Sequence, residues 1–404
     1  MPRVIASRLA GFGTTIFTEM SALAERTGAI NLGQGFPDED GPAEVLEAAA
    51  AAMRAGHNQY APLAGVPALR EAIAAHQRRF YGLEIDGELG VQVTFGATEA
   101  ISGALLGLLD DGDEVIVFEP LYDSYAAGIA MAGGRRRVVT LRPPDWAIDP
   151  DALAAAVTRR TRLVLLNSPH NPTGKVFARA ELELVADVCR EHDLVAMTDE
   201  VYEHLVYEGE HIPLATLPGM AERTVTISSL GKTFSVTGWK VGWASGPPEL
   251  VAGVRAAKQY LSFSGATPLQ HAGAAGLALD DRFYAGLAEA FREKRNHLCA
   301  GLEGAGLRPI RPAGTYFVNA RVDGDGVAFC RELPDLAGIV AIPTGVFYDD
   351  PEAGRSLVRF AFCKRAAVID EAAARLAAAR LMGRDERKLA ALAEPHELDC
   401  TTDL

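Results

Sequence analysis

Residues 162–174 read RLVLLNSPHNPTG, and residues 194–202 read LVAMTDEVY. Each stretch opens with an apolar run and turns polar at Asn167 and at Asp199, respectively. Short apolar runs of this kind are typical of strands that are covered on both faces. Residues 179–191, which lie between them, have the length and spacing of a helix. The order strand, helix, strand predicts a parallel sheet with helices on both sides.

The same alternation extends outward from this core, from about residue 91 to residue 246. The predicted strands are Val91–Phe95, Glu114–Phe118, Arg137–Leu141, Arg162–Leu166, Leu194–Thr198, Thr224–Ser228 and Lys240–Ser245. We therefore expect an α/β fold whose large domain, at residues 45–290, holds a mostly parallel seven-stranded sheet flanked by helices.

The pattern changes after residue 250. The expected helices are 250–261, 268–278, 282–305 and 369–381, and the expected strands are Thr315–Ala320 and Leu357–Ala361. We predict a smaller α+β domain at residues 291–383. The N-terminal segment 1–44 is expected to form part of this smaller domain. The tail at residues 384–404 is polar and acidic, and we expect it to be loosely ordered.

Composition excludes several classes of partner. The 404 residues carry a formal net charge of −14 without a Lys/Arg-rich tract, so neither nucleic acid nor a membrane surface is expected as a partner. The longest apolar runs are too short to cross a bilayer. The five cysteines are dispersed and form no CxxC pair, which is typical of reduced thiols. We predict a soluble cytoplasmic protein.

Polar signals follow four of the predicted strands where each strand ends. They are Gly96-Ala97-Thr98, the turn from Asn167 to Gly174, Asp199-Glu200-Val201-Tyr202, and Ser229-Leu230-Gly231-Lys232. Ligands of open α/β sheets bind beyond the carboxyl ends of the strands. Four such signals in sequence indicate one binding site.

Each signal also has a purely structural interpretation. Gly96-Ala97-Thr98 is either a tight turn or a phosphate site made by free N–H groups at a helix start. Asn171 either shapes its turn or donates a hydrogen bond to a phenolate oxygen. Asp199 follows an apolar run, and a partly buried carboxylate normally has a cationic partner. Tyr202 either packs or reaches the same ligand.

Three cations stand out from the surface lysines and arginines. Lys232 follows a strand and lies among small residues, and a lysine near a phosphate loop with a lowered pKa suits covalent chemistry with carbonyl compounds. Lys240, eight residues later, is a possible phosphate partner. Arg359 lies alone in an apolar strand-like stretch, so it binds either a substrate carboxylate or an internal acid.

Taken together, the motifs resemble those of the fold-type I, pyridoxal 5′-phosphate-dependent class I/II aminotransferases. The resemblance covers residues 31–381 and is carried by NLGQGFP at 31–37, NPTG at 171–174, DEVY at 199–202, SLGK at 229–232 and GWK at 238–240. It implies an enzyme that moves an amino group between an amino acid and a 2-oxo acid, with glutamate and 2-oxoglutarate as the expected second pair. It implies pyridoxal 5′-phosphate as the cofactor; no metal is expected.

The resemblance also implies roles for individual residues. Lys232 matches the lysine that bonds the cofactor and moves the proton from the substrate Cα. Asp199 matches the acid that pairs with the pyridinium nitrogen, and Asn171 and Tyr202 match the partners of the ring 3′-oxygen. The remaining cofactor-binding positions are Ala97, Thr98, Ser229 and Lys240 at the phosphate and Tyr122 on the ring face.

Substrate and subunit contacts are implied in the same way. Arg359 matches the anchor of the substrate α-carboxylate, with Gly35 and Asn171 beside it, and Phe17 is expected at the substrate side chain. Tyr60 matches a tyrosine that reaches the phosphate of the neighbouring subunit. The resemblance therefore implies a homodimer with shared active sites.

Within the family, the sequence is most similar to N-succinyldiaminopimelate aminotransferases and to glutamine/kynurenine transaminases. Kynurenine-type enzymes carry a bulky Phe-His pair where this chain has Gly265-Ala266. We expect these small residues to enlarge the pocket and to favour a long acyl-amino acid. The alternatives are a glutamine, methionine or kynurenine transaminase and a lyase acting on cysteine S-conjugates. A DNA-binding regulator of the same fold is disfavoured because the chain is acidic and shows no spare N-terminal domain.

Overall fold

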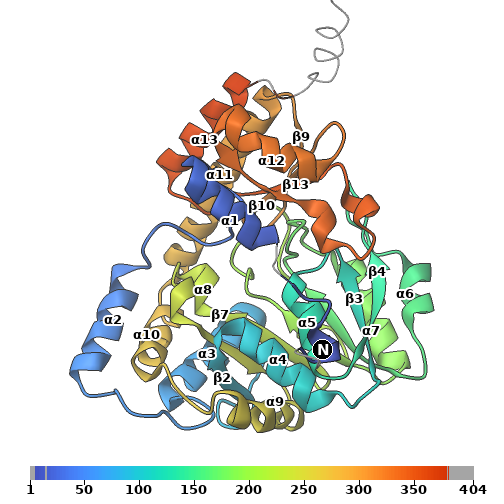
Figure 1. The fold of residues 1–404 in the computed structure, drawn as a ribbon. Coiled ribbons are helices and arrows are strands. Elements are labelled where there is room, and N and C mark those ends of the chain that lie inside the picture. The colour runs from blue at the N-terminus through green and yellow to red at the C-terminus, as the bar shows by residue number, and fades with distance from the viewer. Residues whose placement is uncertain (1–4, 14–15, 380, 382–404) are drawn as a thin grey trace, which may run out of the picture.

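A computed structural model describes residues 5–13, 16–379 and 381 of the chain, and its largest element is a seven-stranded sheet (Figure 1). The strand order is β2-β8-β7-β6-β5-β3-β4. The strands are β2 (Val91–Phe95), β3 (Glu114–Glu119), β4 (Arg135–Thr140), β5 (Thr161–Asn167), β6 (Val195–Asp199), β7 (Thr224–Ser229) and β8 (Val241–Ser245). The prediction of a mostly parallel seven-stranded sheet is confirmed, with small shifts at the strand ends.

One strand runs against the others. β8 is antiparallel to both of its neighbours, β2 and β7, whereas β7, β6, β5, β3 and β4 are mutually parallel. The start of β8 therefore lies at the same edge of the sheet as the carboxyl ends of the other strands. Sequence periodicity does not report strand direction, so this reversal was not predicted.

Helices cover both faces of the sheet, which explains why its strands are apolar throughout. In β5, Leu163 and Leu165 join the core beneath α4 and α9, whereas Val164 and Leu166 join the core beneath α6 and α7. The helices around this sheet are α2 (Ala43–Arg54), α3 (Pro67–Tyr81), α4 (Gly96–Leu108), α5 (Asp123–Met131), α6 (Pro150–Ala156), α7 (Arg179–Glu191), α8 (Leu230–Thr233), α9 (Pro248–Leu261) and α10 (Thr267–Leu277).

A second, smaller sheet lies in the upper part of Figure 1. Its strands are antiparallel in the order β12 (Ile342–Pro343), β13 (Leu357–Ala361), β10 (Phe317–Arg321) and β9 (Arg308–Ile310). A separate parallel pair joins β1 (Ile30–Asn31) to β11 (Ile339–Val340). The helices here are α1 (Ile16–Thr27), α11 (Asp281–Gly304), α12 (Gly326–Ala337) and α13 (Ala366–Ala379).

The N-terminal helix packs with this smaller sheet, because Met20 and Ala24 of α1 are buried in the same core as β10 and β13. α11 runs across the predicted boundary between residues 290 and 291, so the exact domain limits stay predictions. The expected loose tail at 384–404 lies outside the described residues.

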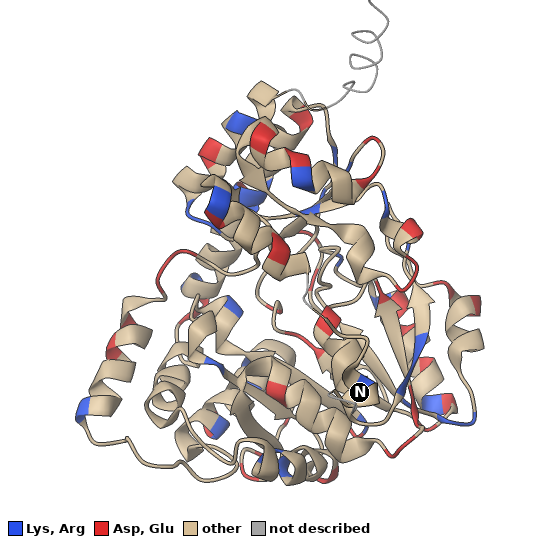
Figure 2. Ribbon diagram, in the orientation of Figure 1, with Lys and Arg blue, Asp and Glu red and all other residues tan. Residues whose placement is uncertain are grey.

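Surface and redox features agree with the composition. Figure 2 shows Lys and Arg interspersed with Asp and Glu over the ribbon. Among the described helices, none combines the length and the apolar character that crossing a membrane requires. Four of the cysteines are buried and free, namely Cys189, Cys299, Cys330 and Cys363. Cys400 lies outside the described residues.

Candidate active site

A cavity of about 410 Å³ lies at the edge of the large sheet where its parallel strands end and β8 begins. Strand β13 of the smaller sheet closes it through Arg359. The predicted site residues that line it are Phe17, Gly35, Ala97, Thr98, Tyr122, Asn171, Asp199, Tyr202, Ser229, Lys232, Lys240 and Arg359. Tyr60 does not line it, and neither do Gly265 and Ala266, which were expected to enlarge the substrate pocket.

Lys232 lies on the short helix α8 and opens onto this cavity. Its Nζ lies 3.4 Å from the carbonyl oxygen of Gly35, which is too long for a strong hydrogen bond. Burial lowers the pKa of Lys232 to about 8, although the nearby Asp199 carboxylate acts in the opposite direction. A substantial fraction of this amine is therefore neutral near physiological pH and available as a nucleophile and base.

Asp199 lies at the end of β6 and is buried. Its Oδ2 accepts a hydrogen bond of 2.7 Å from the hydroxyl of Tyr125. Burial raises the pKa of Asp199, whereas the hydroxyl of Tyr125 and the backbone N–H of Val201 oppose that rise. Among the described residues, the ion pairs do not include Asp199, so its carboxylate has hydrogen-bond donors but no cation in contact. Such a site complements a protonated ring nitrogen.

Arg359, on β13, is buried and, like Asp199, forms no ion pair with any other described residue. Its Nη1 donates to Oδ1 of Asn171 and its Nη2 to the carbonyl oxygen of Gly33, both at 3.0 Å. Its Nε is buried without a hydrogen-bond partner. The guanidinium carbon lies 4.0 Å from the ring centroid of Phe317. In the described part of the chain no carboxylate pairs with it, so the internal salt bridge considered from the sequence is wrong.

Asn171 is oriented by two neighbours. Its amide oxygen accepts from Arg359, so its Nδ2 is the donor left for a ligand in the cavity. Its backbone N–H donates to Oδ1 of Asn167 at 2.7 Å, and Nδ2 of Asn167 donates to the carbonyl oxygen of Asp199 at 2.8 Å. Asn167, the last residue of β5, therefore links Asn171 in the following turn to Asp199 at the end of β6.

The opposite end of the cavity suits an anion. Gly96 has φ +71° and starts α4, and the N–H groups of the first turn of a helix attract negative charge. A side chain built at Gly96 would place its Cβ 3.1 Å from Nζ of Lys240, so this amine lies directly beside the helix start. Thr98 and Ser229 add hydroxyl groups to the same lining.

One expectation from the sequence is wrong, and another is not tested by a single chain. Gly265 and Ala266 do not line the cavity but a separate small hollow, and a Cβ on Gly265 would meet the ring of Phe95 at 2.5 Å. Within one chain, Gly265 and Ala266 therefore do not enlarge the pocket, and that prediction is wrong. Gly265 is small because the ring of Phe95 packs against it. Tyr60 is 77% exposed and contacts Phe263, so its role toward a neighbouring subunit stays a prediction.

Sequence reasoning also missed residues that the cavity includes. Tyr125 and Asn167 both contact the segment around Asp199, and Asp123 lies in the same wall. Asn167 is the last residue of β5, so the strand-end rule that selected its neighbours also pointed to it. Tyr125 is only three residues beyond Tyr122, on the adjacent turn of α5.

Comparisons with known proteins agree with this geometry. The family model for class I and II aminotransferases matches residues 27–376. A probable N-succinyldiaminopimelate aminotransferase of Mycobacterium tuberculosis is 52% identical over 92% of this chain and 97% of its own. The methionine aminotransferase of Escherichia coli is 43% identical over 93% of this chain and 98% of its own.

The solved structures give the same answer for the fold. The structure of the N-succinyldiaminopimelate aminotransferase from M. tuberculosis superposes with a TM-score of 0.90 at 51% identity, over 93% of this chain and all of that one. This chain belongs to the class I and II aminotransferases, enzymes of fold type I that use pyridoxal 5′-phosphate.

Proposed function

We propose that this enzyme transfers an amino group from N-succinyl-LL-diaminopimelate to 2-oxoglutarate, or in the reverse direction. The observation that carries the amino acid part of this proposal is Arg359, a buried guanidinium with an unpartnered Nε in the same cavity as Lys232 and Asp199. The 52% identity to the mycobacterial relative supports the succinylated substrate.

The residues of the cavity fit the cofactor. Asp199 offers a buried carboxylate without a cation, the start of α4 and Lys240 form an anion site, and Lys232 has a lowered pKa. When bound, the cofactor supplies an electron sink for the electron pair left at the substrate Cα after deprotonation. In this proposal Lys232 bonds the cofactor, and Asp199 keeps its ring nitrogen protonated.

The other roles follow from the donors that remain free. With the cofactor bound, Asn171 Nδ2 and the hydroxyl of Tyr202 would be the donors available to its ring 3′-oxygen. Burial keeps the pKa of Tyr202 well above its ordinary value, so this hydroxyl stays protonated. Arg359 holds the substrate α-carboxylate and thereby fixes the Cα near Lys232. The amine of Lys232 takes the Cα proton, and the aromatic side chains of Phe17 and Phe317 shield this step from water.

The substrate assignment is tested by a screen of amino donors against 2-oxoglutarate, with glutamate formation as the readout. We expect the highest kcat/KM for N-succinyl-LL-diaminopimelate. The second candidate is a methionine or kynurenine transaminase, which the 43% identity to the E. coli methionine enzyme and the 38% identity to human kynurenine–oxoglutarate transaminase 1 favour. Efficient exchange with these donors but none with the succinylated one would establish it, and a thiol released from cysteine S-conjugates would indicate lyase activity.

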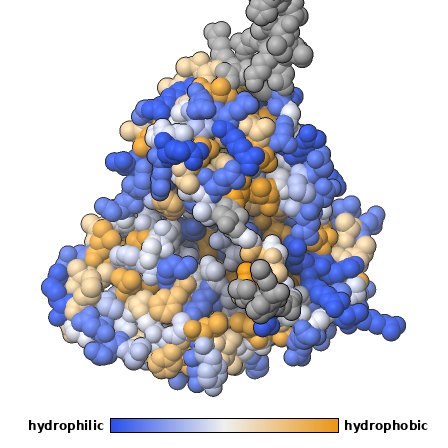
Figure 3. Space-filling model, in the orientation of Figure 1, coloured by the Kyte–Doolittle hydropathy of each residue, from blue (hydrophilic) through white to orange (hydrophobic). Residues whose placement is uncertain are grey.

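We also propose that the enzyme acts as a cytoplasmic homodimer in which Tyr60 reaches the partner's phosphate site. Support comes from the exposed aromatic side chains of Tyr60, Tyr260 and Phe263. Figure 3 shows apolar side chains at the surface of the lower part of the molecule, where α2 lies. Mixing inactive Lys232→Ala chains with Tyr60→Phe chains tests the sharing: recovered activity after demonstrated subunit exchange supports it, and no recovery counts against it.

A further inference from the structure

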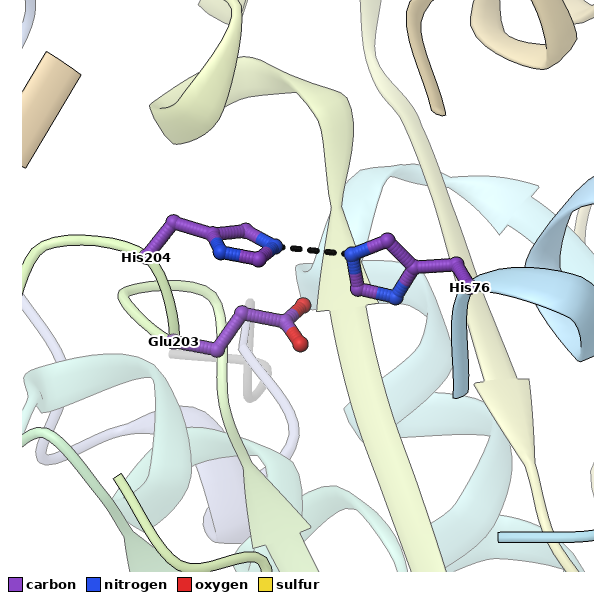
Figure 4. Close-up of side chains that lie close together, drawn as sticks. All are labelled: His76, Glu203 and His204. Atoms are coloured by element: carbon purple, nitrogen blue, oxygen red, sulfur yellow. Dashed lines mark hydrogen bonds between the residues drawn. The ribbon is translucent and has the colours of Figure 1, made fainter. Parts of the chain in front are cut away.

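A cluster of three ionisable side chains lies outside the cavity described above. His76 comes from α3, whereas Glu203 and His204 come from the turn that follows β6 (Figure 4). Figure 4 shows the two imidazoles facing each other with the Glu203 carboxylate beside them. One nitrogen or oxygen from each of the three lies within 4.8 Å of the others. His76 and Glu203 are buried, and His204 is partly exposed.

The buried carboxylate has no cation in contact. Tyr81 and Ser228 donate hydroxyl hydrogen bonds to Glu203 at 2.8 and 2.7 Å, but in the described residues neither Lys nor Arg forms an ion pair with it. Tyr81 donates to one of its oxygens and Ser228 to the other, so both oxygens act as acceptors, as those of an ionised carboxylate do. A buried anion is normally paired with a cation or bound to a metal.

The two histidines have nitrogen lone pairs to offer. Nδ1 of His76 is buried and has no hydrogen-bond partner among the described residues. Nε2 of His76 and Nε2 of His204 lie 2.7 Å apart, where one ring donates a hydrogen bond to the other. Among the described residues neither ring forms an ion pair or a hydrogen bond with the Glu203 carboxylate, although one ligand atom from each of the three side chains lies within 4.8 Å of the others.

We propose that His76, Glu203 and His204 form a binding site for one divalent transition-metal ion of the zinc class. Two imidazoles and one carboxylate are a ligand set that Zn²⁺ takes, with water in the fourth position. Mg²⁺ and Ca²⁺ prefer sites made wholly of oxygen atoms, so they are disfavoured here. The ion supplies the positive charge that Glu203 lacks.

Binding requires a small rearrangement. A tetrahedral Zn²⁺ about 2.0–2.1 Å from each nitrogen needs the two nitrogens about 3.3 Å apart, so the present hydrogen bond must open. His204 is the more exposed of the two rings and is the one we expect to move, although it too packs on Phe80 and Tyr284.

A bound ion would connect α3 to the turn that carries Tyr202, one residue before Glu203. A ligand that binds only the folded chain stabilises it by RT ln(1 + L/Kd), where L is the free ligand concentration and Kd its dissociation constant. We therefore expect Zn²⁺ to raise the midpoint temperature of unfolding of the cofactor-loaded enzyme. The same rise should be absent when either imidazole is removed.

The experiment uses chelator-treated, cofactor-loaded protein without amino acids present. Equilibrium dialysis against Zn²⁺ should find one ion per chain, and Co²⁺ should give the visible bands of a tetrahedral N/O site. His76→Ala and His204→Ala should each lose the ion and the spectrum, whereas the matched control His271→Ala should keep both. His271 packs against His57 in a second imidazole pair, with ring centroids 4.2 Å apart.

Three outcomes would overturn the proposal. One is absence of stoichiometric binding to the wild-type enzyme, which would leave the hydrogen bond between the rings as the role of the pair. Another is unchanged binding in both cluster variants, and the third is loss of binding in His271→Ala alone. Because His76→Ala opens a cavity in the core, His204→Gln serves as a second variant, with the bound-cofactor absorbance verifying that each protein is folded.

Discussion

Two buried charges of opposite sign, Asp199 and Arg359, face one cavity from two different sheets. Asp199 ends a parallel strand and is held by the hydroxyl of Tyr125, whereas Arg359 lies in an antiparallel strand and is held by carbonyl-type oxygens and an aromatic face. Nearby, Lys258 and Glu99 form an ordinary buried pair at 3.4 Å. The two unpaired charges therefore mark where ligand groups complete the site, and the paired ones mark structure.

The largest effect is expected at Asp199. Asp199→Asn should lower turnover roughly 10²–10³-fold, because a neutral amide no longer stabilises charge at the ring nitrogen. The same substitution should increase the stability of the cofactor-free protein at neutral pH, although it lowers turnover. Burial raises the folded pKa of Asp199, so the wild-type carboxyl stabilises the fold at low pH and loses that contribution as the pH rises through the folded pKa.

Denaturant unfolding of the two cofactor-free proteins checks this increase in stability. The Asn variant should be the more stable one at pH 7, and the difference should shrink as the pH falls toward about 4. Equal stability at every pH, together with near-normal turnover, would show that Asp199 does not act as the partner of the ring nitrogen.

The next largest effect is expected at Arg359. Arg359→Ala should weaken the binding of every amino acid substrate by roughly 2–5 kcal/mol, since it leaves the substrate carboxylate without its partner. Arg359→Lys should recover only part of this, because an ammonium does not bind a carboxylate through two parallel N–H groups. Steady-state KM and kcat/KM measure the loss. Arg355→Ala removes an exposed, ion-paired arginine and is the control; if it weakens substrates equally, the effect is not specific to the site.

A smaller effect is expected at Tyr125, which holds Asp199 through its hydroxyl. A hydrogen bond to a charged group contributes roughly 1.5–3 kcal/mol, and Tyr125→Phe deletes one. The pKa of Asp199 should rise further, which should move the acidic limb of the pH–rate profile to higher pH. Tyr348→Phe, which loses another buried hydroxyl, should leave that limb in place. An unmoved limb in Tyr125→Phe would make Tyr125 a packing residue only.

The smallest effect is expected in the chemical reactivity of the Lys232 amine, which can be measured without any catalytic turnover. In cofactor-free protein, the rate of acylation at Lys232 should rise with pH and reach half its maximum near pH 8, because the neutral amine is the reactive form. Peptide mapping across a pH series measures this, with Lys232→Ala as the blank. A midpoint near the ordinary value of about 10.4 would contradict a desolvated amine.

Much of the fold and most of the site followed from the sequence, and the reasons are local. Apolar runs bounded by polar residues located all seven large-sheet strands, and the strand-end rule brought residues as distant as Ala97 and Lys232 to one cavity. Neither the apolar runs nor the strand-end rule predicts which distant side chains contact each other. The hydrogen bond from Tyr125 to Asp199 spans 74 positions, and the contact of His76 with His204 spans 128. Likewise, the fit of Gly265 against Phe95 is a packing fact that composition does not encode.

The reversed strand β8 has a further consequence for spacing. A parallel successor to β7 would need a crossover of a dozen or more residues, usually with a helix, before reaching the sheet again. Because β8 runs back beside β7, the short stretch 230–240 carries Lys232 at one end and Lys240 at the other. The distance between the two amines is thus set by one compact connection. An insertion in a surface loop elsewhere leaves this distance unchanged. An insertion or deletion within residues 230–240 would change the distance between the amines of Lys232 and Lys240.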